Sequence, residues 1–362
     1  MKKKQTNAAQ TLRYYWKKAI KYRWILALNL FGIFLGILGE GFLGPLILRD
    51  IFDIFAQNGD KEILFDQIKI LIFWLFIVYT ICDLGGWRIG QFANNYFQPY
   101  VMRDIEKDCF EKLQTHSFKF FSNHFSGGLV SKTNRFSRSF EMIADVLQWN
   151  IFPITIRFVF AISVIFYFEK TIAFFFLIWT FFYVLASYLF AQWTQKYWRN
   201  AAKNDSKVTG DLADSMTNIF TVKIFAGQRF EKKRFWNTVL TRQKARTAAW
   251  RSGAWMAVWQ GGAMIIFEIL VFYLMANAWK EGVLSVGTIF AIQTFVLMIF
   301  HGLWELGRRF QDYANALSDA EEMMEILAQE PDVLDSKKPE KCKISKGAIA
   351  FEKVGFRYAT DK

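Results

Sequence analysis

Few residues of this 362-residue chain have the types and spacing that chemistry requires. The three cysteines, Cys82, Cys109 and Cys342, lie far apart and are odd in number. This favours free thiols over a disulfide framework or a CxxC metal site. The three histidines share no zinc-ligand spacing, and the HExxH motif is absent. We therefore expect neither a metal site nor a catalytic residue in this chain.

Glycine motifs for nucleotide binding are missing or out of place. No GxxxxGK[ST] phosphate loop occurs, so we do not expect the chain by itself to hydrolyse ATP. The segment 39–44 matches GxGxxG by letter, but it follows no strand and lies in an apolar stretch. A dinucleotide site needs a strand before these glycines and a helix after them. A helix kink or close helix packing better explains Gly32, Gly36, Gly39, Gly41 and Gly44.

Charged and amide side chains inside apolar stretches are the candidates for a substrate pathway. They are Glu40, Arg157, Glu268 and Gln293. A charge inside a bilayer costs about 2.5–3.5 kcal/mol on insertion scales and usually faces a cavity or a partner. The functional interpretation is contact with a transported substrate. The structural alternative is pairing within the bundle, for example between Arg157 and Glu268.

The elements that position these side chains are six apolar stretches. Each has about the length of the 20-residue helix that crosses a bilayer. Helices are the only plausible spans, because backbone groups cannot go unpaired in lipid. The stretches are 24–48, 68–86, 151–168, 171–191, 254–279 and 284–303. The sequence therefore predicts an all-α membrane protein with six transmembrane helices.

Basic segments set the expected orientation. Eight Lys or Arg and no acid precede the first span, and residues 196–246 carry twelve cations against four acids. Basic segments stay in the cytoplasm. We expect both termini and both long loops there, in a multi-pass protein of a bacterial inner membrane. Topology thus explains the net charge of +13, and no nucleic-acid partner is needed.

The two long cytoplasmic segments, 87–150 and 192–251, are unusual loops. Both mix apolar and charged residues at helical spacing, and neither is rich in Gly, Pro or Ser. We expect the spans to continue as helices into the cytosol, turn and return. Thirty helical residues reach about 45 Å.

The chain changes character after residue 327. Residues 328–346 are polar and contain two prolines, which predicts a linker. Residues 347–358 alternate apolar and polar side chains, which predicts a strand. We expect a cytoplasmic segment at 1–23, a membrane domain at 24–327, and the truncated start of a nucleotide-binding domain at 347–362, continuing past residue 362.

Four segments resemble the membrane half of an ABC exporter of the six-span type, which is fused to an ATPase domain. They are the first cytoplasmic turn (120–131), the second (214–225), the sixth span with its extension (287–327), and the opening strand of the ATPase domain (347–358). Their order and spacing together carry the resemblance. Asn218 stands where the family often has Gly, and Asn tolerates a left-handed backbone.

The resemblance implies a mechanism. Two such chains pair, as a second copy or a paralogous half-transporter, and each brings an ATPase domain that binds ATP with Mg²⁺. Short coupling helices at the ends of the hairpins seat on those domains. ATP closes the domains, and the membrane cavity flips from inward to outward facing. A lipid, peptide or drug-like amphipathic substrate then leaves the cell.

The resemblance also implies roles for individual residues. Tyr358 is the counterpart of a family aromatic residue that stacks on adenine. The coupling residues that it implies are Phe120, Phe121, Ser122 and Asn123 in the first turn, and Thr217, Asn218, Ile219, Phe220 and Thr221 in the second.

Two alternatives belong to other classes. One is an ATPase-free membrane remnant or scaffold, and a phosphate loop downstream of residue 362 would decide against it. The other is a secondary transporter, in which we would expect repeated halves and broken helices at the midplane. No internal repeat is present, and the 60-residue hairpins have no role in such a transporter.

Overall fold

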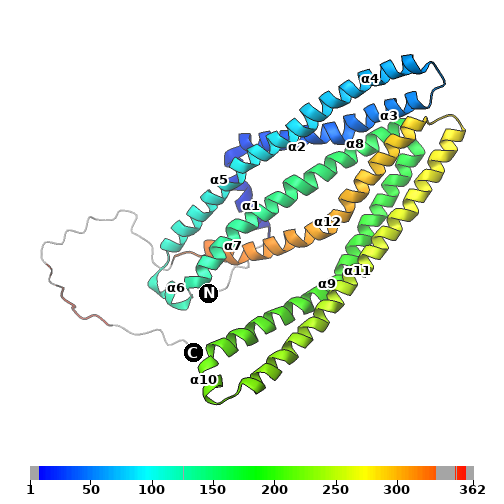
Figure 1. The fold of residues 1–362 in the computed structure, drawn as a ribbon. Coiled ribbons are helices and arrows are strands. Elements are labelled where there is room, and N and C mark those ends of the chain that lie inside the picture. Colours follow the sequence, from blue (N-terminus) through cyan, green and yellow to red (C-terminus); the bar gives the residue numbers. More distant parts are fainter. Residues whose placement is uncertain (1–7, 125, 332–346, 348, 356–362) are drawn as a thin grey trace.

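The computed structural model describes residues 8–124, 126–331, 347 and 349–355. Within these ranges, six helices are long and apolar enough to cross a membrane. The predicted architecture of six long transmembrane helices is confirmed (Figure 1). The described part of the predicted strand, residues 347 and 349–355, forms no strand, and the remainder lies outside the described residues.

Each of the first three helical rods contains a π-helical segment. The first rod consists of α1 (Ala8–Ala19), the short 3-10 helix η1 (Ile20–Tyr22), α2 (Arg23–Leu38), the π-helix η2 (Gly39–Leu43) and α3 (Gly44–Phe55). The second consists of α4 (Lys61–Val78), the π-helix η3 (Tyr79–Gly85) and α5 (Gly86–Gln114). The third consists of α7 (Ser126–Asp145), the π-helix η4 (Val146–Ile151) and α8 (Phe152–Phe168).

The remaining rods are uninterrupted helices. They are α9 (Lys170–Thr217), α11 (Gln228–Lys280) and α12 (Val286–Leu327). Two short helices, α6 (Phe118–Asn123) and α10 (Ile219–Ile224), form the turns of the long hairpins. Both hairpin tips lie at one end of the molecule, and the three short connections between rods lie at the other (Figure 1).

Side chains cap the helices that follow the short connections at the end opposite the tips. Glu169 alone joins α8 to α9, and its carboxylate accepts the backbone N–H of Thr171 at 3.1 Å. Asp60 accepts the N–H of Glu62 at 2.9 Å in the same way. Such caps satisfy donors that a helix start leaves unpaired. The predicted hairpin of the third and fourth spans therefore needs only one residue outside its helices.

Helix α12 links two apolar cores. Near its start, Ala291, Phe295 and Ile299 are fully buried in a core shared with α8, α9 and α11. Towards its end, Ala316 and Met323 lie in a second core with α1, α5 and α7. Because α12 belongs to both cores, it connects the membrane part of the bundle to the first hairpin.

Helices α2 and α5 cross at glycines. A Cβ on Gly32 would lie 2.8 Å from the carbonyl oxygen of Gly86 and would also overlap Gly90. In the adjoining π-helices, a Cβ on Gly39 of η2 would lie 2.7 Å from the Cβ of Cys82 of η3. Small residues permit such close approach of membrane helices. The packing interpretation of the glycine-rich first span is confirmed.

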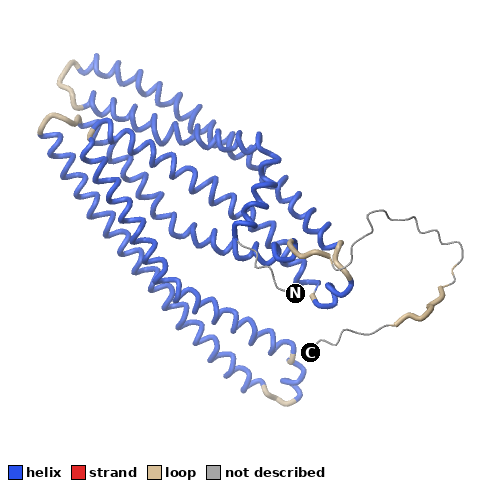
Figure 2. Tube along the Cα trace, turned by 180° about the vertical axis from the view of Figure 1, so that it is seen from behind, coloured by secondary structure: helices blue, strands red, loops and turns tan. Residues whose placement is uncertain are grey.

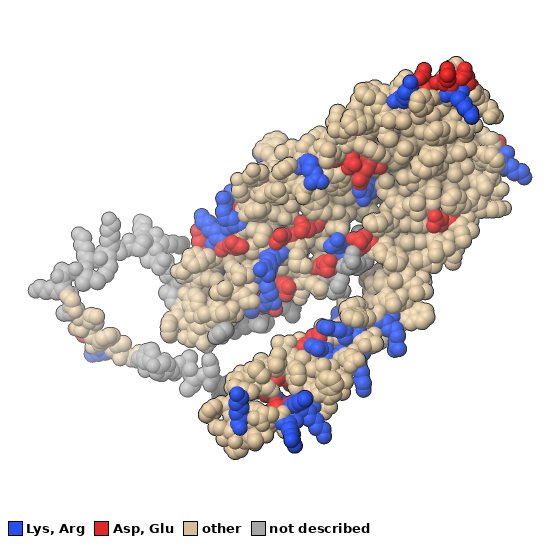
Figure 3. Space-filling model, in the orientation of Figure 1, with Lys and Arg blue, Asp and Glu red and all other residues tan. Residues whose placement is uncertain are grey.

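The second hairpin diverges from the rest of the bundle (Figures 1 and 2). Polar contacts hold its two helices together along its length. Arg246 pairs with Asp205 at 2.8 Å, Thr238 donates to Asp211 at 2.6 Å, and Arg234 pairs with Asp214 at 3.3 Å. Ser215 also donates to Glu231 at 2.7 Å. All four acids of residues 196–246 thus bind side chains of the facing helix within the hairpin. Cations cover the outer surface of the hairpin (Figure 3).

Candidate functional site

The tip of the first hairpin is the short helix α6, and its aromatic residues face two ways. Phe120 is buried and stacks between His116 and His124, with ring centroids 4.1 and 4.2 Å apart. Phe118 and Phe121 are 87% and 39% exposed on the opposite side. Residues three apart share a helix face, which explains this division. Phe120 therefore anchors α6, whereas Phe118 and Phe121 form its outer surface.

The other implied coupling residues of this turn lie at the end of α6. Ser122 is exposed, and its hydroxyl donates to the carbonyl oxygen of Phe118 at 3.1 Å. Asn123 is the last residue of the helix. Phe118 was absent from the implied set, although the spacing of exposed apolar residues at positions 118 and 121 was a signal for it.

The tip of the second hairpin begins where Asn218 ends α9. Its side-chain amide donates to the carbonyl oxygen and the carboxylate of Asp214, both at 3.0 Å. The φ and ψ of Asn218 are −97° and 17°, so the left-handed backbone that Asn tolerates is not used here. Ala226, with φ of 49°, takes that conformation after α10 instead.

Helix α10 exposes a cluster of large apolar side chains. Phe220 is 74% exposed, and Thr217 and Thr221 beside it are also exposed. The exposed large apolar side chains of α10 and its C-cap are Ile219, Phe220, Ile224 and Phe225. The implied coupling set contained only the first two, and the spacing of residues 220 and 224 was the signal for the rest. Two apolar tips far from the apolar spans indicate surfaces that bind a partner.

The intramembrane candidates form pairs. Arg157 of α8 forms an ion pair with Glu40 of η2. The suggested pair of Arg157 with Glu268 is therefore wrong, because the first and third spans bring Glu40 to this guanidinium. Asp83 of η3, which the sequence analysis did not consider, interacts electrostatically with both charges and shares a side-chain hydrogen bond with Trp87. This cluster joins the π-helical segments η2 and η3 of the first two spans to α8 of the third.

Glu268 has a different partner. The side-chain amide of Gln293 on α12 donates to Glu268 of α11 at 2.6 Å. The pair links the fifth and sixth spans, and Glu268 stays partly exposed. The structure thus brings together Glu40 with Arg157, and Glu268 with Gln293, as two separate pairs.

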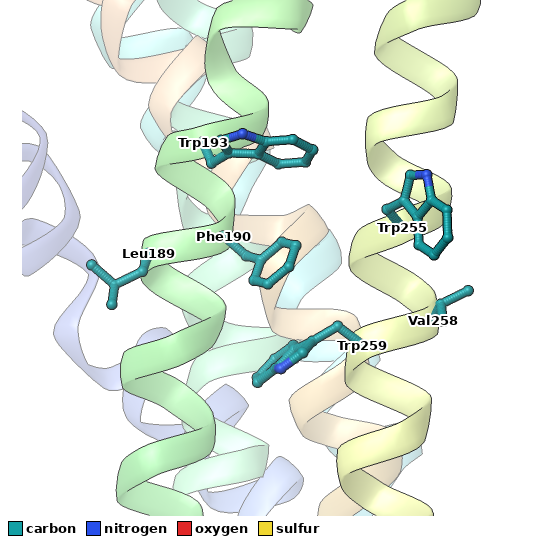
Figure 4. Close-up of a pocket in the computed structure, with 6 residues that line it drawn as sticks. All are labelled: Leu189, Phe190, Trp193, Trp255, Val258 and Trp259. Atoms are coloured by element: carbon teal, nitrogen blue, oxygen red, sulfur yellow. The ribbon is translucent and has the colours of Figure 1, made fainter.

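Two of the cavities beside the long helices are large. The larger, about 780 Å³, opens between α9 and α11 and is lined by Leu189, Phe190, Trp193, Trp255, Val258 and Trp259 (Figure 4). The other, about 500 Å³, is polar, and its lining includes Arg88, Asp145 and Arg309. The sequence analysis did not consider either set, because their residues come from helices far apart in the chain.

The described residues contain no group of three or more His, Cys, Asp or Glu side chains that can hold a metal ion. Tyr358, the expected adenine-stacking residue, lies outside the described residues.

Comparison with known proteins identifies the scaffold. The family profile described as "ABC transporter transmembrane region" matches residues 26–303, which is most of the chain. The chain belongs to the ABC transporter transmembrane family. Its membership accounts for six spans, two long hairpins and a short helix at each tip. It also decides against the secondary transporter.

Relatives of this ABC transporter chain include members of the B family. "ABC transporter B family member 6" from Dictyostelium discoideum is 24% identical over 328 residues, which is 90% of this chain and 46% of that protein. "Heavy metal tolerance factor 1" from Caenorhabditis elegans is 26% identical over 76% of this chain and 36% of its own length. "Iron-sulfur clusters transporter ATM1, mitochondrial" from Debaryomyces hansenii is 22% identical over 88% and 47%.

A solved structure shares the fold of this ABC transporter chain. It is titled "Structure of a bacterial Atm1-family ABC exporter with ATP bound", and it superposes with a TM-score of 0.64 at 18% identity. The match covers 84% of this chain and 54% of that one. The chain spans about half or less of the length of the relatives named above.

Proposed function

We propose that this chain is the membrane domain of an ATP-driven exporter that moves an amphipathic substrate outward by alternating access. The observation that carries the proposal is the pair of apolar tips. Phe118 and Phe121 on α6, and Phe220 on α10, stand exposed far from the spans. An exposed apolar surface gains free energy when a partner covers it. ATPase domains are the partners that fit this place in an ABC transporter.

ATP and Mg²⁺ are proposed to bind on those ATPase domains. The chain contains no phosphate loop, and its described residues contain no cluster of metal ligands. It therefore lacks the backbone cradle and the lysine that hold a triphosphate. Tyr358 keeps its proposed role of stacking on adenine at the edge of the ATPase domain.

A second chain, either another copy or a paralogous half-transporter, is the other proposed partner. The diverging hairpin of α9, α10 and α11 supports this, because beyond the spans it packs mainly on itself. Trp198, Trp236 and Trp250 are exposed on it. Aromatic side chains are favoured at interfaces because they bury large apolar area.

The proposed substrate is a lipid, a peptide or a drug-like amphipathic compound. Glu268 supports a cationic group on it, because its carboxylate is partly exposed and its hydrogen-bond partner among the described residues is the uncharged amide of Gln293. Glu40 and Arg157 neutralise each other and favour neither sign. Replacing Glu268 by Gln preserves an acceptor for Gln293 and removes only the charge.

The proposed orientation places both termini and both hairpins in the cytoplasm. The cations on the outer surface of the second hairpin support it. The bacterial inner membrane is the proposed location. The alternative is a mitochondrial membrane, since one relative is named as mitochondrial.

The test uses the full-length protein in inside-out proteoliposomes with a cationic dye, its neutral analogue and an anionic dye. We expect ATP-dependent uptake, and Glu268→Gln should weaken uptake of the cation more than uptake of the neutral analogue. Absence of any ATP-dependent uptake, together with ATPase activity that no substrate changes, would favour the scaffold alternative.

A further inference from the structure

An aromatic groove runs between α9 and α11. Its rings stack in sequence: Trp179 on Tyr183 at 4.9 Å, Tyr183 on Trp259 at 5.5 Å, and Trp259 on Phe190 at 5.4 Å between centroids. The 780 Å³ cavity opens at the hairpin end of this stack. A smaller cavity of about 270 Å³ continues along it and shares Leu189 and Trp259 with the 780 Å³ cavity. The groove is therefore long, narrow and almost wholly apolar.

The groove lies at a definite depth. Helix α9 begins at Lys170 and α11 ends at Lys280, both at the end opposite the hairpin tips. At 1.5 Å per residue, the cavity-lining residues 189–193 and 255–259 lie about 28–37 Å from those ends. The hydrocarbon core of a bilayer is about 30 Å thick. The cavity therefore sits where hydrocarbon meets the headgroups on the hairpin side.

The cavity is open towards its surroundings. Trp255 and Val258 are 61% and 63% exposed, and Leu189 is exposed as well. In Figure 4 the rings of Trp193 and Trp259 point into the space between the two helices. Tryptophan is enriched at this depth of a membrane because its ring is apolar and its N–H is polar. An apolar chain entering from the side finds continuous contact here.

Cations stand one turn beyond the cavity on both helices. Lys196 follows Trp193 by three residues, and its ammonium lies 5.8 Å from the Trp193 ring and 5.0 Å from the Tyr197 ring. Arg251 precedes Trp255 by four residues and is exposed. Residues three or four apart share a helix face. Both cations therefore border the hairpin end of the groove.

We propose that this groove binds an anionic phospholipid of the membrane. One acyl chain lies along the aromatic stack, and the phosphate is held by Lys196 and Arg251. The apolar lining matches the acyl chain, and the two cations match the phosphate. The depth of the cavity matches the boundary between hydrocarbon and headgroup. To cover Lys196 and Arg251 at the hairpin end of the groove, a second copy of the chain would have to present an acidic side chain at this level. The placement in the cytoplasmic leaflet rests on the proposed orientation, but binding itself does not require transport.

The test is lipid retention by the protein reconstituted in nanodiscs of phosphatidylglycerol and phosphatidylcholine in equal amounts. Native mass spectrometry then counts the lipids that stay bound after release from the nanodisc. We expect retained phosphatidylglycerol in preference to phosphatidylcholine. The double variant Lys196→Gln/Arg251→Gln should bind phosphatidylglycerol about 30-fold more weakly, because it loses the attraction of two surface cations for the phosphate. The matched control is Lys232→Gln/Lys233→Gln, which removes two cations from α11 near the hairpin tip.

Three results would overturn the proposal. The first is equal retention of phosphatidylglycerol by the double variant and the control. The second is equal retention of both lipids by the unaltered protein. The third is an efficient disulfide between Val258→Cys positions of two chains with no retained lipid, which would assign the groove to a second copy. ATP-dependent uptake by the same protein in proteoliposomes reports separately on the proposed export function.

Discussion

The carboxylate of Asp53 accepts the backbone N–H of Gly287 at 2.7 Å and thereby fastens the end of the first span to the start of the sixth. Its other oxygen accepts the hydroxyl of Ser285 at 2.9 Å. Ser285 in turn accepts the N–H of Thr288 at 3.1 Å and caps α12. A carboxylate beside a helix start is also favoured by the helix dipole. This clamp closes the bundle at the end opposite the hairpin tips.

Gly287→Ala should break the clamp. A Cβ at this position would overlap the carbonyl oxygen of Arg49 and lie 2.7 Å from the carboxyl carbon of Asp53. We expect a loss of about 1–3 kcal/mol, as for other overpacked sites, seen as a lower melting temperature in detergent. The control is Gly262→Ala, where nothing lies within 4 Å. Equal melting temperatures for Gly287→Ala and the unaltered protein would contradict the clamp.

A double-mutant cycle should detect the Glu40–Arg157 pair. Glu40→Gln and Arg157→Gln each leave one charge without its partner. We expect a coupling free energy of about 1–2 kcal/mol, since contacting residues couple and this pair is only partly buried. The same cycle between Arg157 and Glu268 is the control. Coupling in the control and none in the first cycle would reverse the assignment.

The long helices were predictable from the sequence because hydropathy and charge alternate along it on the scale of a bilayer. The clustered glycines also predicted close helix packing, which the structure shows where Gly32 meets Gly86 and Gly90. Both features depend on local composition. Each was therefore visible without knowing which spans are neighbours.

Contacts between spans were not predictable in the same way. Three acids in other spans could have paired with Arg157, and the arrangement of the helices in space is what brings Glu40 next to it. Phe120 is buried and Phe121 is exposed because of the face that α6 packs against the rest of the first hairpin. The aromatic groove needs residues on α9 and α11 that lie far apart in the sequence, such as Phe190 and Trp259. A single sequence does not contain these pairings.

Stability should depend on the ionisation of Asp104. Lys21 donates to its carboxylate at 2.6 Å and Tyr22 at 2.9 Å, and Arg103 pairs with it. The bond from Lys21 is the largest cause that lowers the pKa of Asp104 from 3.8 to about 2. A lowered folded pKa gives stability that is present above the unfolded pKa and is lost as pH falls towards 2.

The measurement compares Asp104→Asn with the unaltered protein at several pH values. Asp104→Asn should cost about 1–2 kcal/mol at neutral pH, and the difference should shrink between about pH 4 and pH 2. Glu111→Gln is the control, because its pair with Lys107 is exposed. A difference that persists unchanged down to pH 2 would rule out this source of stability.

Labelling should establish the orientation. Single cysteines at Gln57 and Glu281 lie in the short connections, and one at Asn204 lies on the second hairpin. In a background without native cysteines, a membrane-impermeant maleimide should label the first two from outside intact cells. Position 204 should react only after permeabilisation, because the basic hairpin stays inside. Strong outside labelling at 204 would invert the proposed topology.

Charges placed on the apolar tips should uncouple ATP hydrolysis from transport in the full-length protein. Phe121→Asp, Ile219→Asp and Phe220→Asp each put a carboxylate on an exposed apolar surface. Folding of the membrane domain should survive, because these side chains are exposed in it. Docking should weaken by about 2–5 kcal/mol, since a charge buried at a packed contact loses its hydration.

Two controls separate docking from folding. Thr115→Asp adds an acid beside α6 without removing an apolar side chain, and it should transport normally. Phe120→Ala removes the buried anchor, and it should lower the free energy of unfolding by about 3 kcal/mol, seen as a lower melting temperature. The decisive measurement is substrate-stimulated ATPase activity beside uptake. If both stay normal in Phe121→Asp and in Phe220→Asp, the tips do not couple the ATPase domains to the spans. If hydrolysis continues while uptake stops, the apolar surfaces transmit the motion.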